Sequence, residues 1–116
     1  MSYISFFIGI SSMDIVDVYI TTKNLKESRK LAKILVRERL AACVNIIPKI
    51  ESMYWWKGKI NHHGESAIIA KTKKNNVRKI VYRVKSIHSY SMPCVVALPI
   101  KDGNANYLRW IKREVR

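Results

Sequence analysis

The sequence of 116 residues predicts an α+β fold, a ferredoxin-like βαββαβ sandwich followed by an extra C-terminal helix. Two observations carry this prediction. A β-rich run, a helical pattern and a second β-rich run follow one another twice, and a tight turn joins the two copies. The chain is long enough for one domain with its own core. Its 4 glycines and 3 prolines are too few to suggest disorder.

The first copy begins with the β-rich run 15–21, which we expect to be a central strand. Asn24, with a glutamate three positions later, is typical of a helix N-terminus. The helix should extend to about Arg39, and a second strand should start at Cys43. Because Pro48 has no N–H to donate to a ladder, we expect a bulge or a sheet edge there.

A hairpin joins the two copies at Lys57-Gly58, since glycine readily adopts the positive φ of a tight turn. The return strand starts near Lys59. We expect the polar patch 61–64 to interrupt it and the strand to resume at 66–72.

The second helix should be capped by Asn75 or Asn76, and a fourth strand should span 94–100. Asn104 can cap the short terminal helix. The second helix carries an apolar stripe at helical spacing, made of Val77, Ile80, Val81, Val84 and Ile87.

One face of the predicted sheet has little to cover it. Both long helices pack on the same face, yet the middle strands carry apolar residues on both faces, and only the short terminal helix remains. An apolar sheet face of this kind indicates a binding surface or an oligomer interface. The run Tyr54-Trp55-Trp56 adds three adjacent rings. At least one must point away from the core, because neighbouring strand residues face opposite sides, and we expect at least one other to pack into it.

The net charge of +14 would attract polyanions. The 22 basic residues are dispersed along the chain, however, so we favour a compositional bias over a nucleic-acid surface. Cys43 and Cys94 form no CxxC or zinc motif and indicate reduced thiols in a cytoplasmic protein. Residues 1–12 precede the domain pattern and read as a poorly ordered extension, too short and too weakly flanked for a membrane span or a signal peptide.

Six segments, in order and spacing, are similar to one known family: ERLAACVNIIP, YWWKGKI, IAKT, HSYSMP, VALPI and NANYLRW. From Asp14 onward the chain resembles the CutA divalent-cation tolerance family. The resemblance implies a CutA-like domain over 13–116, assembling as a tight homotrimer whose sheets meet edge to edge. It also implies a role in tolerance of copper or another divalent cation.

The resemblance further implies which side chains meet between subunits. The long hairpin of such a trimer reaches a neighbouring subunit, so its rings become subunit contacts and line the clefts between subunits. Large, rigid aromatic side chains suit such contacts. The implied interface residues are Tyr54, Trp55, Trp56, Tyr90 and Trp110. Core packing and base stacking are the alternative uses of the hairpin rings.

Candidate metal ligands follow from the same motifs. Cys43 lies in LAACVN and His88 in H-x-Y-x-x-P, and thiolate and imidazole are suitable ligands for copper. Some family members have ligands where Ile20 and Ile87 stand here. With those positions apolar, we expect weak metal binding unless Cys94 or a neighbouring subunit completes the set.

Two further features bear on metal chemistry. His62-His63, followed by Glu65, offers a second weak site in the hairpin, with a solvated bulge as the alternative. In the loop after the second helix the family form is HPYEVPE. Here Ser89, Ser91 and Cys94 replace its proline and two acids, which removes carboxylate ligands from the cleft.

The sequence also bears on two other function classes. An RNA-binding module using the basic ferredoxin-like sheet is the alternative, because RNA-recognition motifs share the βαββαβ order. Its aromatic signature is missing from the third strand, where Ser66 to Ile69 offer no stacking ring. An enzyme is not expected, since the sequence has no nucleophile motif, no P-loop, no acidic pair and no arginine-bearing phosphate loop of the acylphosphatase kind.

Overall fold

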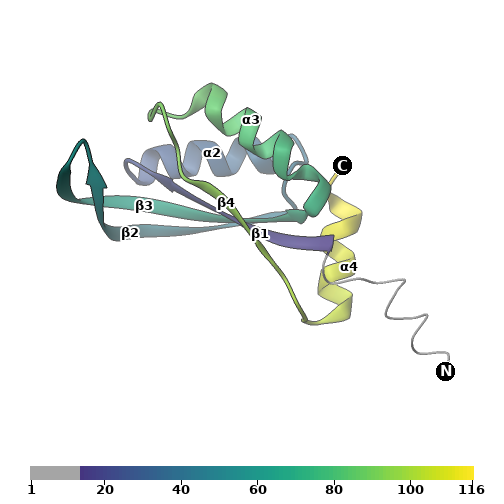
Figure 1. Cartoon of the computed structure of the whole chain (residues 1–116). Helices are drawn as coiled ribbons and strands as arrows, with labels where there is room; N and C mark the ends of the chain where they lie inside the picture. The colour runs from purple at the N-terminus through teal and green to yellow at the C-terminus, as the bar shows by residue number, and fades with distance from the viewer. Residues whose placement is uncertain (1–13) are drawn as a thin grey trace.

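The computed structural model of the chain describes residues 14–116 (Figure 1). The expectation for residues 1–12 therefore lies outside the described residues. The predicted βαββαβ order with a terminal helix is confirmed. In chain order the elements are β1 (Ile15–Thr22), α2 (Leu25–Arg37), β2 (Cys43–Trp56), β3 (Lys59–Lys73), a short 3₁₀ turn (Lys74–Asn76), α3 (Val77–Ile87), β4 (Val95–Pro99) and α4 (Ala105–Glu114).

The four strands form one antiparallel sheet in the order β2-β3-β1-β4. The predicted central position of β1 is confirmed, and β2 and β4 are the edges. Helices α2 and α3 lie together on one face, which we call the helix-covered face, and α4 lies near one end of the sheet (Figure 1). The opposite face is called the open face below.

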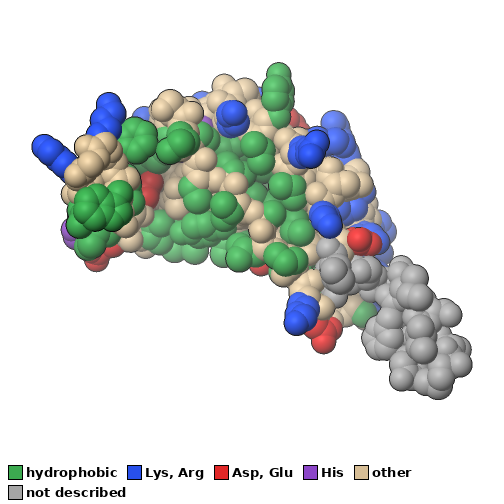
Figure 2. Space-filling model, viewed as in Figure 1, with side chains coloured by type: hydrophobic (Ala, Val, Ile, Leu, Met, Phe, Trp, Pro, Cys, Tyr) green, Lys and Arg blue, Asp and Glu red, His purple; other side chains and the backbone are tan. Residues whose placement is uncertain are grey.

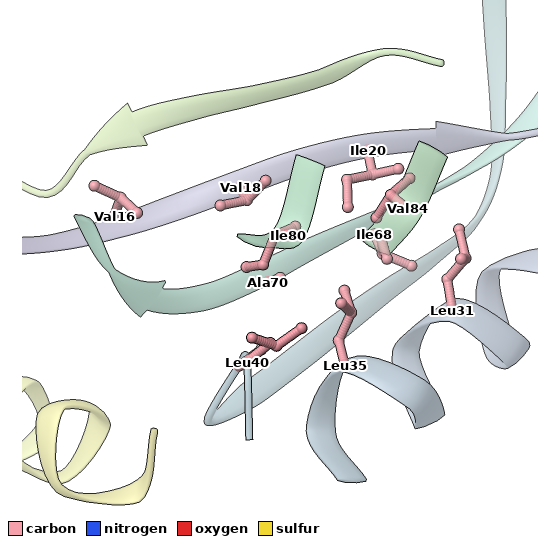
Figure 3. Packing of buried hydrophobic residues seen from close by; sticks show 11 residues of the cluster. Val16, Val18, Ile20, Leu31, Leu35, Leu40, Ile68, Ala70, Ile80 and Val84 are labelled. Atoms are coloured by element: carbon pink, nitrogen blue, oxygen red, sulfur yellow. The ribbon is translucent and has the colours of Figure 1, made fainter. Parts of the chain in front are cut away.

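The main core lies between the helix-covered face and the two long helices (Figure 3). Register aligns alternate residues of the strands into rows on this face, so that Ile46, Ile68 and Ile20 lie side by side. Leu35 of α2 and Val84 of α3 pack onto these rows and are fully buried. Ile80 is also fully buried, and Val77 and Ile87 are partly buried against the same core. The predicted stripe of α3 is thus confirmed at four of its five positions, and Val81 is half-buried.

Helix α2 starts as predicted. The Asn24 side chain accepts a hydrogen bond from Glu27 N at 2.9 Å, and Glu27 Oε1 accepts one from Lys23 N at 3.1 Å. These bonds satisfy backbone donors that a helix N-terminus otherwise leaves unpaired. The helix ends at Arg37, slightly before the expected position. Arg39 has a φ of 58°, a left-handed conformation that cannot continue a right-handed helix.

The long hairpin confirms two predictions and corrects one. The register shifts between Ile47 and Ile50 on the edge strand β2, as expected at Pro48. Lys57 and Gly58 have φ values of 50° and 77°, so both turn residues are left-handed, as in a type I′ turn. The predicted break at 61–64 is wrong, because β3 is continuous and these residues pair with β2. Their polarity reflects exposure of the hairpin to solvent.

The second half of the chain differs from expectation at one cap. Asn76 precedes α3, but its side chain makes no capping bond there. Its amide instead donates to Thr72 Oγ1 at 3.1 Å and to the Arg116 carbonyl at 3.2 Å, so it ties β3 to the C-terminal segment. Asn104 does cap α4, accepting from the backbone N–H groups of the first helical turn.

The open face is apolar in its middle and covered at one end only. Ile15 is buried there by Leu108 and Ile111 of α4. Farther along, Val96 and Leu98 of β4 are 50% and 52% exposed. The predicted shortage of cover on this face is confirmed for the single chain. Within residues 14–116, no helix has the length and apolar character needed to cross a membrane.

Candidate functional site

A cleft of about 720 Å³ lies at the hairpin end of the open face. Figure 2 shows hydrophobic side chains gathered across this side of the molecule up to the hairpin. The walls come from β1, from both strands of the hairpin and from the loop after α3. The residues that line it are Tyr19, Thr21, Glu51, Ser52, Met53, Tyr54, Trp55, Trp56, His63, Glu65, Tyr90, Ser91, Met92 and Cys94.

The hairpin rings stand away from the core. Tyr54, Trp55 and Trp56 are 38%, 71% and 44% exposed. The expectation that at least one of them packs into the core is therefore wrong for the single chain. The physical reason is the length of the hairpin, whose tip turns out of the line of the sheet beyond the helices (Figure 1). These rings lie where a ligand or another subunit can reach them.

The two hairpin histidines have side-chain partners. His63 meets Tyr54 edge to face, with ring centroids 5.3 Å apart and the tyrosine hydroxyl 3.2 Å from Nδ1. His62 Nε2 lies 2.9 Å from a carboxylate oxygen of Glu51. Both histidines are exposed, so the expected solvated character of this patch is confirmed although the strand is not interrupted.

A buried carboxylate forms one wall of the cleft. Glu65 is only 8% exposed, and its Oε2 accepts a hydrogen bond of 2.8 Å from the Tyr90 hydroxyl. Burial raises the pKa of Tyr90, and the hydrogen bond to Glu65 and the nearby negative charge raise it further. In the sequence, Glu65 stands out only as a neighbour of the two histidines. It missed this pair, because the two residues are 25 positions apart and no local pattern joins them.

Glu27 fixes the loop that carries Tyr90. Its Oε2 accepts from Ser89 N at 2.8 Å, and its Oε1 accepts from Ser89 Oγ at 2.9 Å. Burial acts to raise the pKa of Glu27, but the hydrogen bonds that its carboxylate accepts from Lys23 and Ser89 outweigh burial and lower the pKa. The start of α2 and the loop after α3 are thereby held together, which positions one side of the cleft.

His88 uses both of its ring nitrogens within the chain. Nδ1 accepts a hydrogen bond of 2.9 Å from Tyr90 N, so Nε2 carries the proton and donates to the Thr21 carbonyl at 2.8 Å. Ile87 packs against the core beside it, and Ile20 is fully buried within that core. In this arrangement His88 anchors the loop to β1 and has no free lone pair for a metal ion.

Cys43 lies at the other end of the sheet from His88. Cys43 of β2 pairs with Lys71 of β3, which pairs with Asp17 of β1. His88 contacts Thr21, four residues farther along β1. The four-residue separation along β1 corresponds to about 13 Å. The structure therefore does not bring the two candidate ligands together. Cys43 lies instead beside Tyr107 of α4; burial first, and then the nearby thiol, raise the pKa of that tyrosine.

The remaining candidates separate in the same way. Cys94 lines the cleft and is exposed. Among residues 14–116, no three His, Cys, Asp or Glu side chains cluster as metal ligands would. Trp110 packs against the cluster of Ile15, Leu108 and Ile111. Its ring stacks on Tyr107, with ring centroids 5.6 Å apart. Of the five residues expected at subunit contacts, four line the cleft and Trp110 belongs to the α4 end.

Comparison with known proteins gives a consistent result. The model of the CutA1 divalent ion tolerance protein family matches residues 16–114. The divalent-cation tolerance protein CutA of Archaeoglobus fulgidus is 44% identical over 98 residues, which cover 84% of this chain and 95% of that protein. The solved structure of the Thermus thermophilus divalent cation tolerance protein superposes with a TM-score of 0.86 at 41% identity, over 88% of this chain and 99% of the other.

A plant relative is longer. The chloroplastic CutA 1 of rice is 46% identical over 99 residues, which cover 85% of this chain but 56% of the rice protein. This chain thus spans about half the length of that relative and nearly all of the archaeal one. The matched residues include every strand and helix described above except Ile15, the first residue of β1. The chain belongs to the CutA1 divalent ion tolerance protein family.

Proposed function

We propose that this protein is a non-enzymatic, homotrimeric divalent-cation tolerance protein. Family membership carries the proposal. The names of the Archaeoglobus and Thermus relatives state divalent-cation tolerance. The chemistry of the described residues supports the non-enzymatic part, since both ring nitrogens of His88, in the loop beside the cleft, are committed to hydrogen bonds within the chain.

The exposed hairpin supports the trimer. Met53, Trp55 and Ile60 are 68%, 71% and 59% exposed. Exposure of several large apolar side chains side by side is unusual for a monomeric protein and indicates an interaction surface. They lie on the hairpin that includes the edge strand β2, whose outer backbone groups are unpaired within the sheet. An open edge next to large apolar side chains is suited to pairing with another chain. A closed ring in which the hairpin of each copy contacts the next would bury these side chains, and the family resemblance implies three copies.

Light scattering at moderate salt, with and without an RNA oligonucleotide, tests the trimer and the RNA alternative together. We expect a salt-resistant trimer that is indifferent to RNA. A monomer whose mass increases with RNA would contradict the proposal and support the alternative. Glu51 and Glu65 at the cleft disfavour RNA there, because carboxylates repel phosphates.

For the cation itself we propose weak direct binding of Cu(II). His62 and His63 are exposed on the hairpin, whereas both nitrogens of His88 are engaged. Copper titration by calorimetry should therefore lose at least as much binding in a His62→Ala/His63→Ala double variant as in His88→Ala. Tight stoichiometric binding that disappears only in His88→Ala would contradict this part of the proposal.

We also propose a cytoplasmic location. Cys43 and Cys94 are free thiols, and Cys94 is exposed. Exposed thiols persist best in a reducing compartment. Fractionation of the source cells tests this: recovery in the cytoplasmic fraction supports the proposal, and recovery in an oxidising compartment contradicts it.

A further inference from the structure

The outer sides of α2 and α3 carry a dense array of positive charge. Each helix turns its apolar stripe toward the sheet, so the side chains opposite that stripe face solvent (Figure 1). The exposed basic residues of α2 are Lys26, Arg29, Lys30, Lys33 and Arg37. Those of α3 are Arg78, Lys79 and Lys85. We call these residues the basic helix face. Folding thus gathers on one side of the molecule charges that are dispersed in the sequence.

The positive charge of this face has no negative counterpart. The two acidic residues next to it have other partners: Glu27 accepts hydrogen bonds from the loop after α3, and Glu38 pairs with Arg83 at 2.8 Å. Within residues 14–116, no side chain of the basic helix face forms an ion pair. Protein surfaces usually mix both signs of charge, as on α4, where Lys112 pairs with Asp14. The basic helix face is therefore a surface of a single sign of charge.

The basic helix face stays accessible in the proposed trimer. The residues proposed for subunit contacts lie on the hairpin, around the cleft and on α4. The sheet separates the open face from the outer sides of α2 and α3, because both helices lie on the opposite face (Figure 1). Two copies of the basic helix face also repel each other, since like charges at short distance are unfavourable. Assembly through the hairpin and the open face therefore leaves this surface exposed.

The shape of this face fits a planar anionic surface better than a nucleic acid strand. From Lys26 to Arg37 the charges extend about 16 Å along α2. A packed neighbouring helix lies about 8–10 Å to the side, so the two helices form a flat array of charge. Single-stranded RNA is instead bound in grooves with several stacking rings, and the only aromatic residue of α2 and α3 is Tyr82. Tyr82 is strongly exposed, and a tyrosine ring is favourable at the headgroup level of a bilayer.

We propose that the basic helix face docks this protein on anionic lipid bilayers. Clusters of about 4–8 Lys or Arg residues on an amphipathic helix are typical of attraction to phosphatidylserine-rich membranes. The apolar sides of α2 and α3 are buried in the core, so neither helix inserts, and the contact is electrostatic and reversible. The inference goes beyond the proposed function, because it concerns neither a metal ion nor a subunit contact, and one copy carries the whole face.

Co-sedimentation of the full chain with lipid vesicles tests the inference. The probes are vesicles of phosphatidylcholine alone and vesicles of phosphatidylcholine with about one third phosphatidylserine. We expect saturable binding to the anionic vesicles and at least about tenfold weaker binding to the neutral ones. Binding should decline as salt is added, since ions screen exposed charges. Equal binding to both kinds of vesicle, or no binding to the anionic ones at low salt, would overturn the inference.

Matched pairs of arginine variants locate the docking surface. Arg29→Gln/Arg37→Gln removes two charges from α2, so affinity for the anionic vesicles should fall at least about tenfold. The control Arg109→Gln/Arg113→Gln removes two exposed arginines from α4 and lowers the net charge equally, but should change the affinity less than about twofold. Arg29→Lys/Arg37→Lys keeps the charge and should bind like the unaltered chain. Equal losses in the two glutamine variants would indicate attraction by net charge alone and reject the basic helix face.

Two further measurements separate this inference from its neighbours. If an RNA oligonucleotide binds the unaltered chain, the anionic vesicles do not, and Arg29→Gln/Arg37→Gln loses the RNA, the face is a nucleic-acid surface and the lipid inference is overturned. Light scattering on the same samples reports the proposed trimer. An intact trimer that does not bind anionic vesicles overturns this inference alone, whereas a monomer that binds them through the basic helix face contradicts the trimer alone.

Discussion

Ile68 and Ile69 are neighbours in β3 but belong to different parts of the molecule. Ile68 is fully buried under α2 and α3. Ile69 is in register with Tyr19 and, through it, with Val96, which is 50% exposed on the open face. The same strands thus build a closed core on one face and an accessible apolar surface on the other. Folding of the single chain therefore depends on the helix-covered face, while the open face remains available for contacts with other molecules.

The largest expected effect is on assembly. Trp56→Ala should lose the trimer or become insoluble, at a cost of about 3–5 kcal/mol, because a large side chain is removed from the proposed subunit contact. Light scattering and melting over a range of protein concentrations measure it. Val36→Ala is a matched control, since Val36 of α2 is 43% exposed and Trp56 is 44% exposed. A soluble, fully trimeric Trp56→Ala protein with unchanged melting temperature would contradict the proposed contact.

A substitution on the helix-covered face should act differently. Leu35 is fully buried in the core, so Leu35→Ala should lower the free energy of unfolding by about 2–5 kcal/mol. We expect the loss in free energy of unfolding per subunit to be the same at every protein concentration. The reason is that the Leu35 side chain is fully buried within its own chain and cannot contact another subunit. Urea unfolding measures it. A loss confined to low concentration would mean that the two faces are not separate in function.

Glu27 connects the start of α2 to the loop beside the cleft, and its contribution to stability should depend on pH. Glu27→Gln should reduce stability by about 1–2 kcal/mol at pH 7, because hydrogen bonds to a charged acceptor are weakened. The pKa of Glu27 is lowered from 4.5 in the folded chain. Its contribution is therefore present above pH 4.5 and is lost as the pH falls through the lower folded pKa. Unfolding of both proteins across this range checks the sign, and a constant difference at all pH values would contradict it.

The smallest effect concerns the cleft wall. Tyr90→Phe should reduce stability by about 1 kcal/mol, since Glu65 loses its hydroxyl donor. The pKa of Tyr90 is raised above 10, so above that pH the unfolded chain ionises first and the unaltered protein loses stability as pH rises. The variant should lack this part of the decline. Chemical unfolding near neutral pH and above pH 10 compares the two, and identical alkaline profiles would contradict the role of Tyr90.

Features with local causes were predictable from the sequence. The caps at Asn24 and Asn104, the I′ turn residues and the bulge near Pro48 each depend on a few adjacent residues. The predicted break at 61–64 is wrong because the polarity of this patch reflects solvent exposure of a continuous strand.

Features with distant causes were not predictable in this way. The Asn76 side chain does not cap α3 but donates to the carbonyl of Arg116, 40 positions away. His88 donates to the carbonyl of Thr21, 67 positions away. The Glu65–Tyr90 pair likewise has no local signature. The fold could therefore be predicted from periodicity, and the outline of the cleft from the family resemblance. The hydrogen bonds that decide what each cleft residue can do required the folded chain.

The bulge of β2 has a consequence for the two tryptophans. Ile47 pairs with Ala67 and Ile50 with Glu65, so β2 has one residue more than β3 between these two pairs. Before this bulge the odd-numbered residues of β2 point to the open face, and after it the even-numbered residues do. Trp56 thereby continues the row that starts on the open face, and Trp55 points the other way. Deletion of Pro48 would leave Lys49 opposite Ser66 and make the ladder regular, with Ile50 still opposite Glu65 and Trp56 still opposite Lys59. The face on which each indole lies is thus set by its pairing with β3 across the turn, and the bulge accommodates the additional residue of β2 without changing that pairing.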